Sequence, residues 1–475
     1  MRTNRPLVVD LDGTLLRTDV LIECAWAFVK RPMLRCWLML VWLVRGGKAG
    51  LKARLAEFTH LEVTVLPYDA GLVAQLKEER AAGRKLVLAT ATHRRYARAI
   101  ADHLQLFDQV FATEGDVNLS AHRKRDRLVE AFGDKGFDYV GNSRDDLAVW
   151  ASAERAWVVN PERGVMRAAR ELGNVERVIE TRPASWRVWS HALRLHQWLK
   201  NLLILVPLLA AHRMLHVAPT LSVGLAFIAF GLCASSVYLL NDLLDLDDDR
   251  HHPTKRNRPL ASGALPLGWG IALFPILLVA GFALALNDLP ARFALALFGY
   301  YALTLAYSLY LKRQVMVDVV ALAALYTARI VAGAMAIAVP LSFWLLALSM
   351  FIFLSLALVK RYAELHTLQA RGLVKSRGRG YVSTDLPLIS SLGAAAGYLS
   401  VLVLALYIQD GNTARLYRHP DWIWPVCAIL LYWISRIWLI AHRGQMHDDP
   451  VVFAAKDRAS WLVIALCAVI FWLAV

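Results

Sequence analysis

The chain has 475 residues, which is enough for two or three domains. Hydrophobic residues make up 57% of it and Trp occurs 16 times, values that argue against a soluble protein and are typical of a membrane protein with aromatic side chains at the lipid interface. The formal net charge is +15, but most basic residues lie between apolar stretches, so the membrane accounts for them and no nucleic-acid partner is indicated. The five cysteines show neither zinc-site spacing nor a disulfide framework.

Residues 1–178 are predicted to form an α/β domain. Short apolar segments alternate with helical patterns such as Tyr96–Leu106 and Arg125–Phe132, which is typical of a doubly wound parallel sheet. The segments expected to contain strands are Pro6–Leu15, Leu86–Ala89, Gln109–Ala112, Tyr139–Val140 and Ala156–Val159.

The first of these segments carries the motif Asp10-Leu11-Asp12-Gly13-Thr14. Carboxylates at the carboxyl end of a buried strand lie where open α/β sheets place their chemistry. The pattern DxDGT resembles the haloacid dehalogenase (HAD) superfamily, whose members are mostly phosphatases. The resemblance implies that Asp10 is a nucleophile that forms an aspartyl-phosphate and that Asp12 is a general acid and base.

The same resemblance implies that Thr90 holds a phosphoryl oxygen and that Lys124 shields the charge of the nucleophile. It also implies a Mg²⁺ site made by Asp10, Asp12, Asn142 and Asp146, with Asp145 as the alternative to Asp146. The family has an Asp where this chain has Asn142, so one negative charge is lost and weaker Mg²⁺ binding is expected. Two alternatives therefore stay open for this domain, an active phosphatase and a non-catalytic binding module.

Residues 19–66 lie where that superfamily inserts a cap, and their pattern is helical. They contain the apolar run Cys36–Val44, which is too short to span a bilayer. Both a buried cap helix and an interfacial helix that rests on lipid fit this run.

An apolar run long enough to cross a bilayer, Leu221–Leu240, is followed by the segment Asn241–Gly263, NDLLDLDDDRHHPTKRNRPLASG. Helical spacing places its acidic side chains on one face. Carboxylates so clustered repel one another unless a cation neutralises them, and oxygen ligands suit Mg²⁺. The sequence therefore predicts a Mg²⁺ site at Asn241, Asp242, Asp245 and Asp249. A basic group suited to phosphate follows: Lys255, Arg256 and Arg258.

The pattern NDxxDxxxD resembles the first aspartate-rich motif of the UbiA superfamily of intramembrane prenyltransferases. The longer string DRxHPTKRxRPLASG is most similar to its branch of decaprenyl-phosphate phosphoribosyltransferases. This resemblance implies Mg²⁺ as cofactor, a polyprenyl phosphate as lipid substrate and phosphoribosyl diphosphate as donor. The alternative is transfer of a prenyl group from a prenyl diphosphate to an aromatic or other acceptor. Asp318 is followed four residues later by Leu322, which breaks the second DxxxD motif of the aromatic prenyltransferases and favours an anionic acceptor.

After a linker at 179–195, residues 196–475 are predicted to form an all-α membrane domain. Nine apolar spans are expected: Asn201–Leu215, Leu221–Leu240, Leu267–Leu286, Arg292–Leu311, Val317–Val339, Leu341–Lys360, Leu386–Ile408, Trp422–Ile440 and Trp461–Val475. Basic residues concentrate after the second, fourth and sixth spans, the last group including Arg371, Lys375, Arg377 and Arg379. The positive-inside rule then predicts a multi-pass inner-membrane protein whose N-terminal domain and active site face the cytoplasm. A homo-oligomer is left open.

Further polar residues at or within these spans are candidates for substrate binding. Ionisable groups that deep are usually paired and functional. Asp318 and Arg329 are eleven residues apart, so they can share a helix face without touching and each needs another partner. The candidates are Lys200, Asn201, Tyr307, Lys312, Asp318, Arg329, Lys360 and Arg361.

Overall fold

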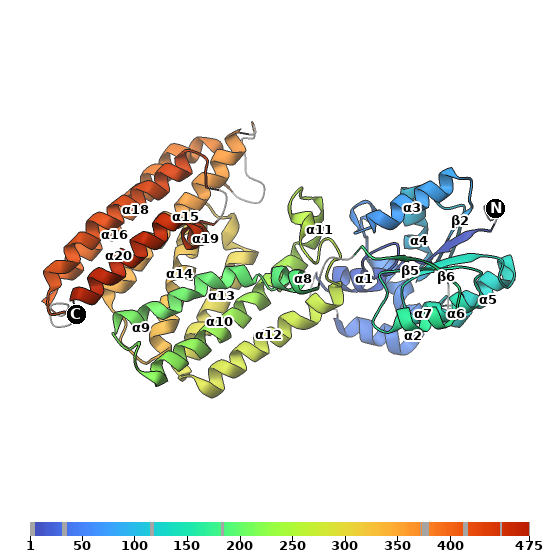
Figure 1. Cartoon of the computed structure of the whole chain (residues 1–475), viewed down its shortest axis with the longest axis horizontal. Helices are drawn as coiled ribbons and strands as arrows, with labels where there is room; N and C mark the ends of the chain where they lie inside the picture. The colour runs from blue at the N-terminus through green and yellow to red at the C-terminus, as the bar shows by residue number, and fades with distance from the viewer. Residues whose placement is uncertain are drawn as a thin grey trace. The chain divides into compact units, whose positions relative to one another are not determined.

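The computed structural model describes residues 5–30, 36–114, 118–181, 185–370, 372, 380–411, 417–446 and 449–474. The chain divides into two compact units (Figure 1). Unit 1 comprises Met1–Leu193 and Leu239–Leu273, and unit 2 comprises Arg194–Tyr238 and Phe274–Val475. The basic residues Arg371, Lys375, Arg377 and Arg379, which support the predicted membrane topology, lie outside the described residues.

Unit 1 is built on a six-stranded parallel sheet in the order β3-β2-β1-β4-β5-β6. Its strands are β1 (Leu7–Val9), β2 (Leu86–His93), β3 (Gln109–Thr113), β4 (Asp138–Gly141), β5 (Ala156–Val159) and β6 (Val175–Ile179). The predicted parallel sheet is confirmed. The edge strand β6 was missed, because it has only one buried residue and carries Glu176 and Arg177 instead of an apolar run.

Helices cover both faces of the sheet, and Figure 1 shows α3 and α4 on one side and α5, α6 and α7 on the other. Leu7 and Val9 pack in one core and Val8 in the other. The first layer holds α1 (Val20–Val29), α2 (Cys36–Phe58), α3 (Ala70–Ala81) and α4 (Arg94–Leu104). The second layer holds α5 (Ala121–Phe132), α6 (Leu147–Ser152) and α7 (Val165–Glu171).

The rest of unit 1 is formed by α8 (Ser185–Ala192) and by the polar segment between two long helices. That segment begins at the end of α10 (Val217–Leu244). It continues through α11 (Leu246–His251) and the short η5 (Lys255–Asn257) to the start of α12 (Leu267–Asp288). The predicted aspartate-rich motif therefore packs within the same unit as the α/β domain.

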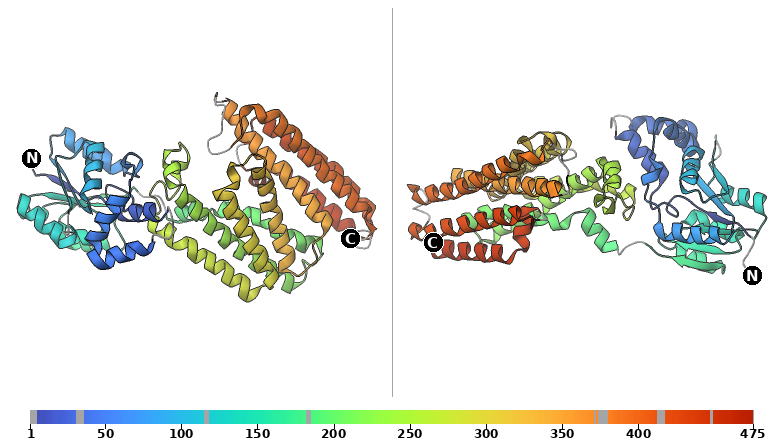
Figure 2. Two further views of the ribbon diagram at one scale, coloured as in Figure 1. Left: turned by 180° about the vertical axis from the view of Figure 1, so that it is seen from behind. Right: turned by 90° about the horizontal axis from the view of Figure 1, so that it is seen from above.

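Unit 2 is helical, and its long helices run side by side (Figure 2). Apart from the remainder of α10 and α12, its main elements are η4 (Leu195–Leu205), α9 (Val206–Ala210), α13 (Ala291–Leu309), η6 (Leu311–Arg313), α14 (Val317–Ala336), α15 (Phe343–Ala370), α16 (Leu386–Gln409), α18 (Trp424–His442), α19 (Pro450–Lys456) and α20 (Arg458–Ala474).

The predicted count of nine spans is not confirmed. Within the described residues, six helices are long and apolar enough to cross a membrane, or seven if α19 and α20, which are bent by 81°, form one span. The first predicted span consists of η4 and the five-residue α9. The fourth forms α13, which carries Arg292 and three tyrosines and is not among the six.

A close helix crossing in unit 2 brings candidate residues together. A Cβ at Gly333 of α14 would lie 2.1 Å from the backbone oxygen of Ile204 in η4. One turn before Gly333 stands Arg329, and one turn before Ile204 stands Asn201, so glycine at this position lets two polar side chains meet.

Replacing Gly333 with Ala should destabilise unit 2 by about 1–3 kcal/mol, because the added methyl group forces α14 and η4 apart. The matched control is Gly299→Ala in α13, where nothing lies within 4 Å of the new Cβ. That change should be neutral or stabilise by about 1 kcal/mol through helix propensity. Thermal unfolding of the purified protein in detergent compares the two. Equal stability of both variants would contradict the close crossing.

Candidate functional site

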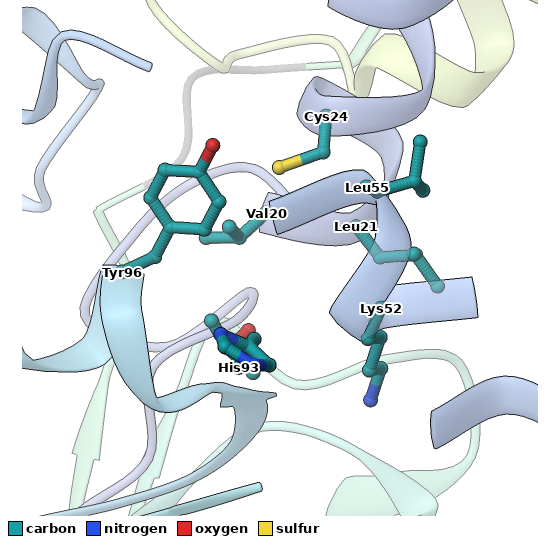
Figure 3. Close-up of a pocket in the computed structure, with 8 residues that line it drawn as sticks. Val20, Leu21, Cys24, Lys52, Leu55, His93 and Tyr96 are labelled. Carbon is teal, nitrogen blue, oxygen red and sulfur yellow. The ribbon is translucent and has the colours of Figure 1, made fainter. Parts of the chain in front are cut away.

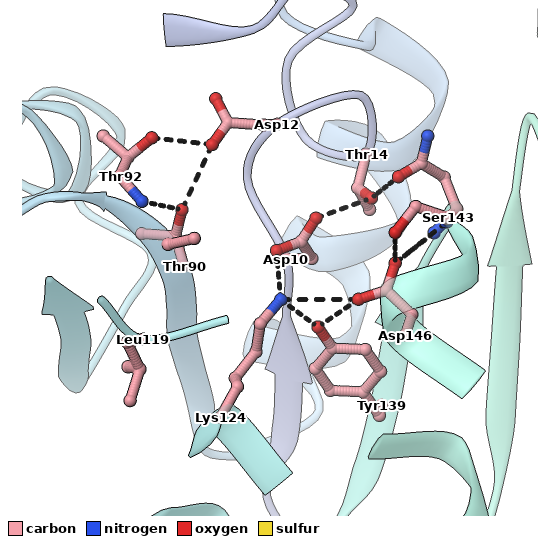
Figure 4. A network of polar contacts seen from close by, with 12 residues as sticks. Asp10, Asp12, Thr14, Thr90, Thr92, Leu119, Lys124, Tyr139, Ser143 and Asp146 are labelled. Atoms are coloured by element: carbon pink, nitrogen blue, oxygen red, sulfur yellow. Dashed lines mark hydrogen bonds and ion pairs between the residues drawn. The ribbon is translucent and has the colours of Figure 1, made fainter. Parts of the chain in front are cut away.

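The α/β domain gathers its predicted site residues at the carboxyl ends of the central strands (Figure 4). Asp10 directly follows β1 and is buried. One of its oxygens accepts a hydrogen bond from Lys124 Nζ at 2.7 Å, and the other accepts one from Thr14 Oγ1 at 3.2 Å. Burial raises the pKa of Asp10, and the ammonium group of Lys124 opposes that rise. Asp10 and Lys124 thus form the charged centre of this site.

Asp12 lies on the same loop with its carboxylate turned toward β2. It accepts hydrogen bonds from Thr92 Oγ1 at 2.6 Å, from the backbone NH of Val20 at 2.9 Å and from Thr90 Oγ1 at 3.4 Å. Burial and the charge of Asp19 raise the pKa of Asp12 to about 6. A carboxyl group with such a pKa can hold or release a proton near neutrality, as a general acid and base must.

Asp146 is saturated with hydrogen bonds. It accepts from Tyr139 OH at 2.8 Å, and the backbone NH groups of Asn142 and Ser143 donate to its other oxygen, each at 2.9 Å. Lys124 lies 3.4 Å away. Asp146 therefore orients Lys124 and the 141–146 loop.

The side chain of Asn142 lies directly against Gly13. A Cβ on Gly13, whose φ is +77°, would come within 2.5 Å of the Asn142 amide nitrogen. Asn142 Oδ1 accepts a hydrogen bond from Thr14 Oγ1 at 3.1 Å. The four predicted ligands of this site lie on adjacent loops and their oxygen donors suit Mg²⁺, but Lys124 already offsets part of their negative charge.

A pocket opens beside Asp12 (Figure 3). It is lined by Val20, Leu21, Cys24, Lys52, Leu55, Thr92, His93 and Tyr96, so α1 and α2 form one wall and the end of β2 forms another. Lys52 Nζ donates to the backbone oxygen of Ala91 at 2.6 Å and to Asn118 Oδ1 at 2.9 Å. Burial lowers the pKa of Lys52.

The apolar run 36–44 at the start of α2 is divided between two environments. Leu38, Met39 and Trp42 pack against the core of the α/β domain. Trp37, Leu40 and Val44 are exposed, at 59%, 65% and 85%. The run is thus neither a fully buried cap helix nor a free one, and its exposed half retains the option of contact with lipid.

The aspartate-rich segment differs from the single helix expected from its spacing. The helix breaks at Asp245, which lies between α10 and α11. Asp242 and Asp249 nevertheless meet, since both accept hydrogen bonds from Nη1 of Arg258, at 3.0 and 2.6 Å. Burial raises the pKa of Asp249, and Arg258 opposes that rise.

The oxygen atoms of these side chains are suitable ligands for Mg²⁺, but their arrangement does not form a ready metal site. Among the described residues, no group of three or more His, Cys, Asp or Glu side chains is arranged to hold a metal. Two buried carboxylates share the cation of Arg258, so the residues fit Mg²⁺ if that guanidinium moves to a ligand phosphate. Lys255 and Arg256 are exposed in η5.

In unit 2 two of the candidate lysines, Lys200 and Lys360, converge on a residue that sequence reasoning missed. Asp449 Oδ2 accepts hydrogen bonds from Lys200 Nζ and Lys360 Nζ, both at 2.9 Å. Tyr326 OH donates to Asp449 Oδ1 at 3.0 Å. Asp449 caps α19, where its position just before Pro450 was the available sequence signal. We call Lys200, Lys360, Tyr326 and Asp449 the lysine cluster.

Arg329 extends this cluster. Its Nε donates to Asn201 Oδ1 at 3.1 Å and its Nη2 donates to Tyr300 OH at 3.2 Å. Asn201 is 1% exposed, and its Nδ2 has no hydrogen-bond partner among the described residues. A buried amide without an acceptor is costly, so this NH₂ group is a ready donor to a bound ligand.

Three of the remaining candidates, Asp318, Arg361 and Tyr307, form a second network. Arg361 pairs with Asp318 and with Glu364 at 2.5 Å and donates to Tyr307 OH at 3.1 Å. Asp318 also accepts from Tyr381 OH. Asp318 and Arg329 thus have separate partners, as their spacing predicted. Lys312 is half-buried in η6.

Two family models match the chain. The UbiA prenyltransferase family matches residues 202–462, and the haloacid dehalogenase-like hydrolase family matches residues 7–149. The uncharacterized protein y4nM of Sinorhizobium fredii is 37% identical over 99% of this chain and 91% of its own length. Nodulation protein NoeC of Azorhizobium caulinodans is 38% identical over 58% of this chain and 89% of its own length.

A decaprenyl-phosphate phosphoribosyltransferase of Mycobacterium tuberculosis is 33% identical over 59% of this chain and 93% of its own length. These matches agree with the helical unit and with the parallel sheet. The chain belongs to the UbiA prenyltransferase family and carries an N-terminal haloacid dehalogenase-like domain.

Proposed function

We propose that this chain transfers phosphoribose from 5-phosphoribosyl 1-diphosphate to a polyprenyl phosphate at the cytoplasmic face of the membrane. An oxygen of the lipid phosphate attacks the anomeric carbon while the bond to the diphosphate breaks. The products are polyprenyl-phosphoryl 5-phosphoribose and diphosphate. Similarity to decaprenyl-phosphate phosphoribosyltransferases supports the donor and acceptor.

The observation that carries the proposal is the charge balance of the lysine cluster and its neighbours. Lys200, Lys360 and Arg329 bring three positive charges to buried or half-buried positions, and Asp449 returns one negative charge. Buried cations require partners, and Asn201 adds an unsatisfied donor. A phosphate monoester supplies both the missing charge and the missing acceptors. An uncharged aromatic acceptor supplies neither.

The leaving diphosphate is assigned to the aspartate-rich segment. Asn241, Asp242, Asp245 and Asp249 would hold Mg²⁺, which neutralises the charge that develops on the departing diphosphate. In this role Arg258 exchanges its carboxylate partners for phosphate oxygens, and the exposed Lys255 and Arg256 bind the remaining phosphate charge.

The N-terminal α/β domain (the front domain) is assigned the next step, hydrolysis of the 5-phosphate. Asp10 would attack the phosphorus atom, the ribose oxygen would leave with a proton from Asp12, and water would then release phosphate from Asp10. A phosphatase in the same chain acts on a membrane-tethered product at high effective concentration.

Phosphoribosyl transfer is tested with purified protein, Mg²⁺, polyprenyl phosphate and phosphoribosyl diphosphate labelled in the ribose. Label should enter the lipid phase, and Asp245→Asn should lower its rate at least about 100-fold, because a ligand of the Mg²⁺ that stabilises the leaving group is lost. Absence of lipid label, together with turnover of a prenyl diphosphate and an aromatic acid, would overturn the proposal in favour of prenyl transfer.

Replacing Asn142 with Asp should raise Mg²⁺-dependent release of phosphate by the front domain about tenfold or more and lower the Mg²⁺ concentration needed. The change restores the negative charge that Asn142 lacks, on a side chain that already lies against Gly13. Release of inorganic phosphate from the phosphoribosylated lipid is measured, with Asp10→Asn as the inactive control. A restored variant that stays silent would indicate a binding module.

Replacing Asp449 with Asn should change the KM for the lipid phosphate more than kcat. The two lysines lose a competing carboxylate, so the expected result is a KM lowered about three- to tenfold, because the phosphate no longer displaces Asp449. Arg436–Asp457 offers a matched control, since it is a part-buried ion pair of the same unit outside the lysine cluster. Asp457→Asn should leave the KM unchanged, and equal effects of both changes would contradict this role for Asp449.

A further inference from the structure

A buried ion pair joins the first cap helix of the α/β domain to the aspartate-rich segment. Glu23 of α1 and Arg250 of α11 are 3% and 8% exposed. Arg250 Nη2 donates to Glu23 Oε1 at 2.6 Å, and Nη1 donates to Oε2 at 3.1 Å. The remaining Nε of Arg250 donates to the backbone oxygen of Ala261 at 3.3 Å. This bidentate geometry fixes the orientation of both side chains.

Other contacts hold α1 and its neighbours along the same segment. Trp26 Nε1 donates to the backbone oxygen of Leu243 at 2.8 Å. Lys30 pairs with Asp247 at 3.3 Å. A Cβ at Gly263, whose φ is +68°, would meet Arg17 Cβ at 2.6 Å, so the backbone after the motif also approaches the front domain closely. The segment is therefore held at its start, middle and end.

Each partner of the ion pair lies beside a candidate site. Thr18 Oγ1 donates to Glu23 at 2.7 Å, and the oxygen of Thr18 accepts from the NH of Gly13 in the loop that bears Asp12. On the other side, Arg250 directly follows Asp249. The NH of Asp249 donates to the oxygen of Asp245 at 2.8 Å, and Arg258 pairs with its carboxylate.

We propose that Glu23 is a positioning residue for the aspartate-rich segment, acting through Arg250 to hold Asp249 where it binds a Mg²⁺–diphosphate ligand. The proposal rests on the proposed diphosphate site but not on phosphoribose as the transferred group. The front domain then serves the membrane reaction as a scaffold, independently of its own chemistry at Asp10. Since α11 has only six residues and is exposed at Asp247 and Asp248, it has little packing of its own to fix Asp249.

The test is titration calorimetry of the full-length protein in detergent with Mg²⁺ and inorganic diphosphate. The diphosphate binding that is lost in the Asp245→Asn variant is taken as binding at the aspartate-rich segment. Glu23→Gln should weaken this binding at least tenfold and raise the KM for the diphosphate donor by a similar factor, with a smaller change in kcat. Arg250→Lys keeps the charge but loses the bidentate geometry, so an intermediate loss of diphosphate binding is expected.

The matched control is Asp138→Asn, which breaks another buried ion pair of unit 1, with Arg84, on β4. It should lower thermal stability about as much as Glu23→Gln while leaving diphosphate binding within twofold. Unchanged binding in Glu23→Gln, or equal loss in Asp138→Asn, would overturn the positioning role. If wild-type protein binds diphosphate through Asp245 but transfers no phosphoribose, the proposed reaction fails and this inference stands. If wild-type protein shows no such binding, both fail.

Discussion

Burial of charge is the constraint on which this molecule depends. A charged side chain that leaves water must be paired or must recruit a counter-ion, because its desolvation is not otherwise offset. Three of the places where the described residues bury charge lie around Lys124, around Arg250 and around Asp449; Arg361–Asp318 and Arg84–Asp138 are further buried pairs. In each place a cation and a carboxylate from distant parts of the sequence meet, so the charged groups themselves specify how their elements pack.

The three places differ in how completely their charges are satisfied. The charges of Glu23 and Arg250 satisfy each other, which suits a structural role. At Asp10 the single cation of Lys124 faces two carboxylates, Asp10 and Asp146, and Asn142 stands where a further carboxylate would strengthen metal binding. The lysine cluster carries excess positive charge, and beside it Asn201, a partner of Arg329, has an unsatisfied amide. Of these three places among the described residues, the surroundings of the lysine cluster are where both an anion and an acceptor are missing, which is why the proposed acceptor is a phosphate.

Much of the fold could be predicted because it follows from local pattern. Apolar segments of strand length separated by helical periods specify a parallel sheet, and long apolar runs specify membrane helices. The edge strand β6 escaped because Glu176 and Arg177 face solvent there. The predicted count of nine spans is not confirmed among the described residues, because apolarity alone does not distinguish a crossing helix from short pieces such as η4 and α9.

The candidate sites also differ in whether a local sequence pattern reveals them. Asp10, Asp12 and the aspartate-rich segment were recognisable because their ligands lie close together in the sequence. Asp449 was not, since its partners are 249 and 89 residues away and its local sequence shows only a helix cap. The same holds for Glu23, which reads as an ordinary first-turn acid of α1 until Arg250 is seen beside it. Where function depends on pairing across the chain, charge in an apolar context marks the residue, but only the fold reveals its partner.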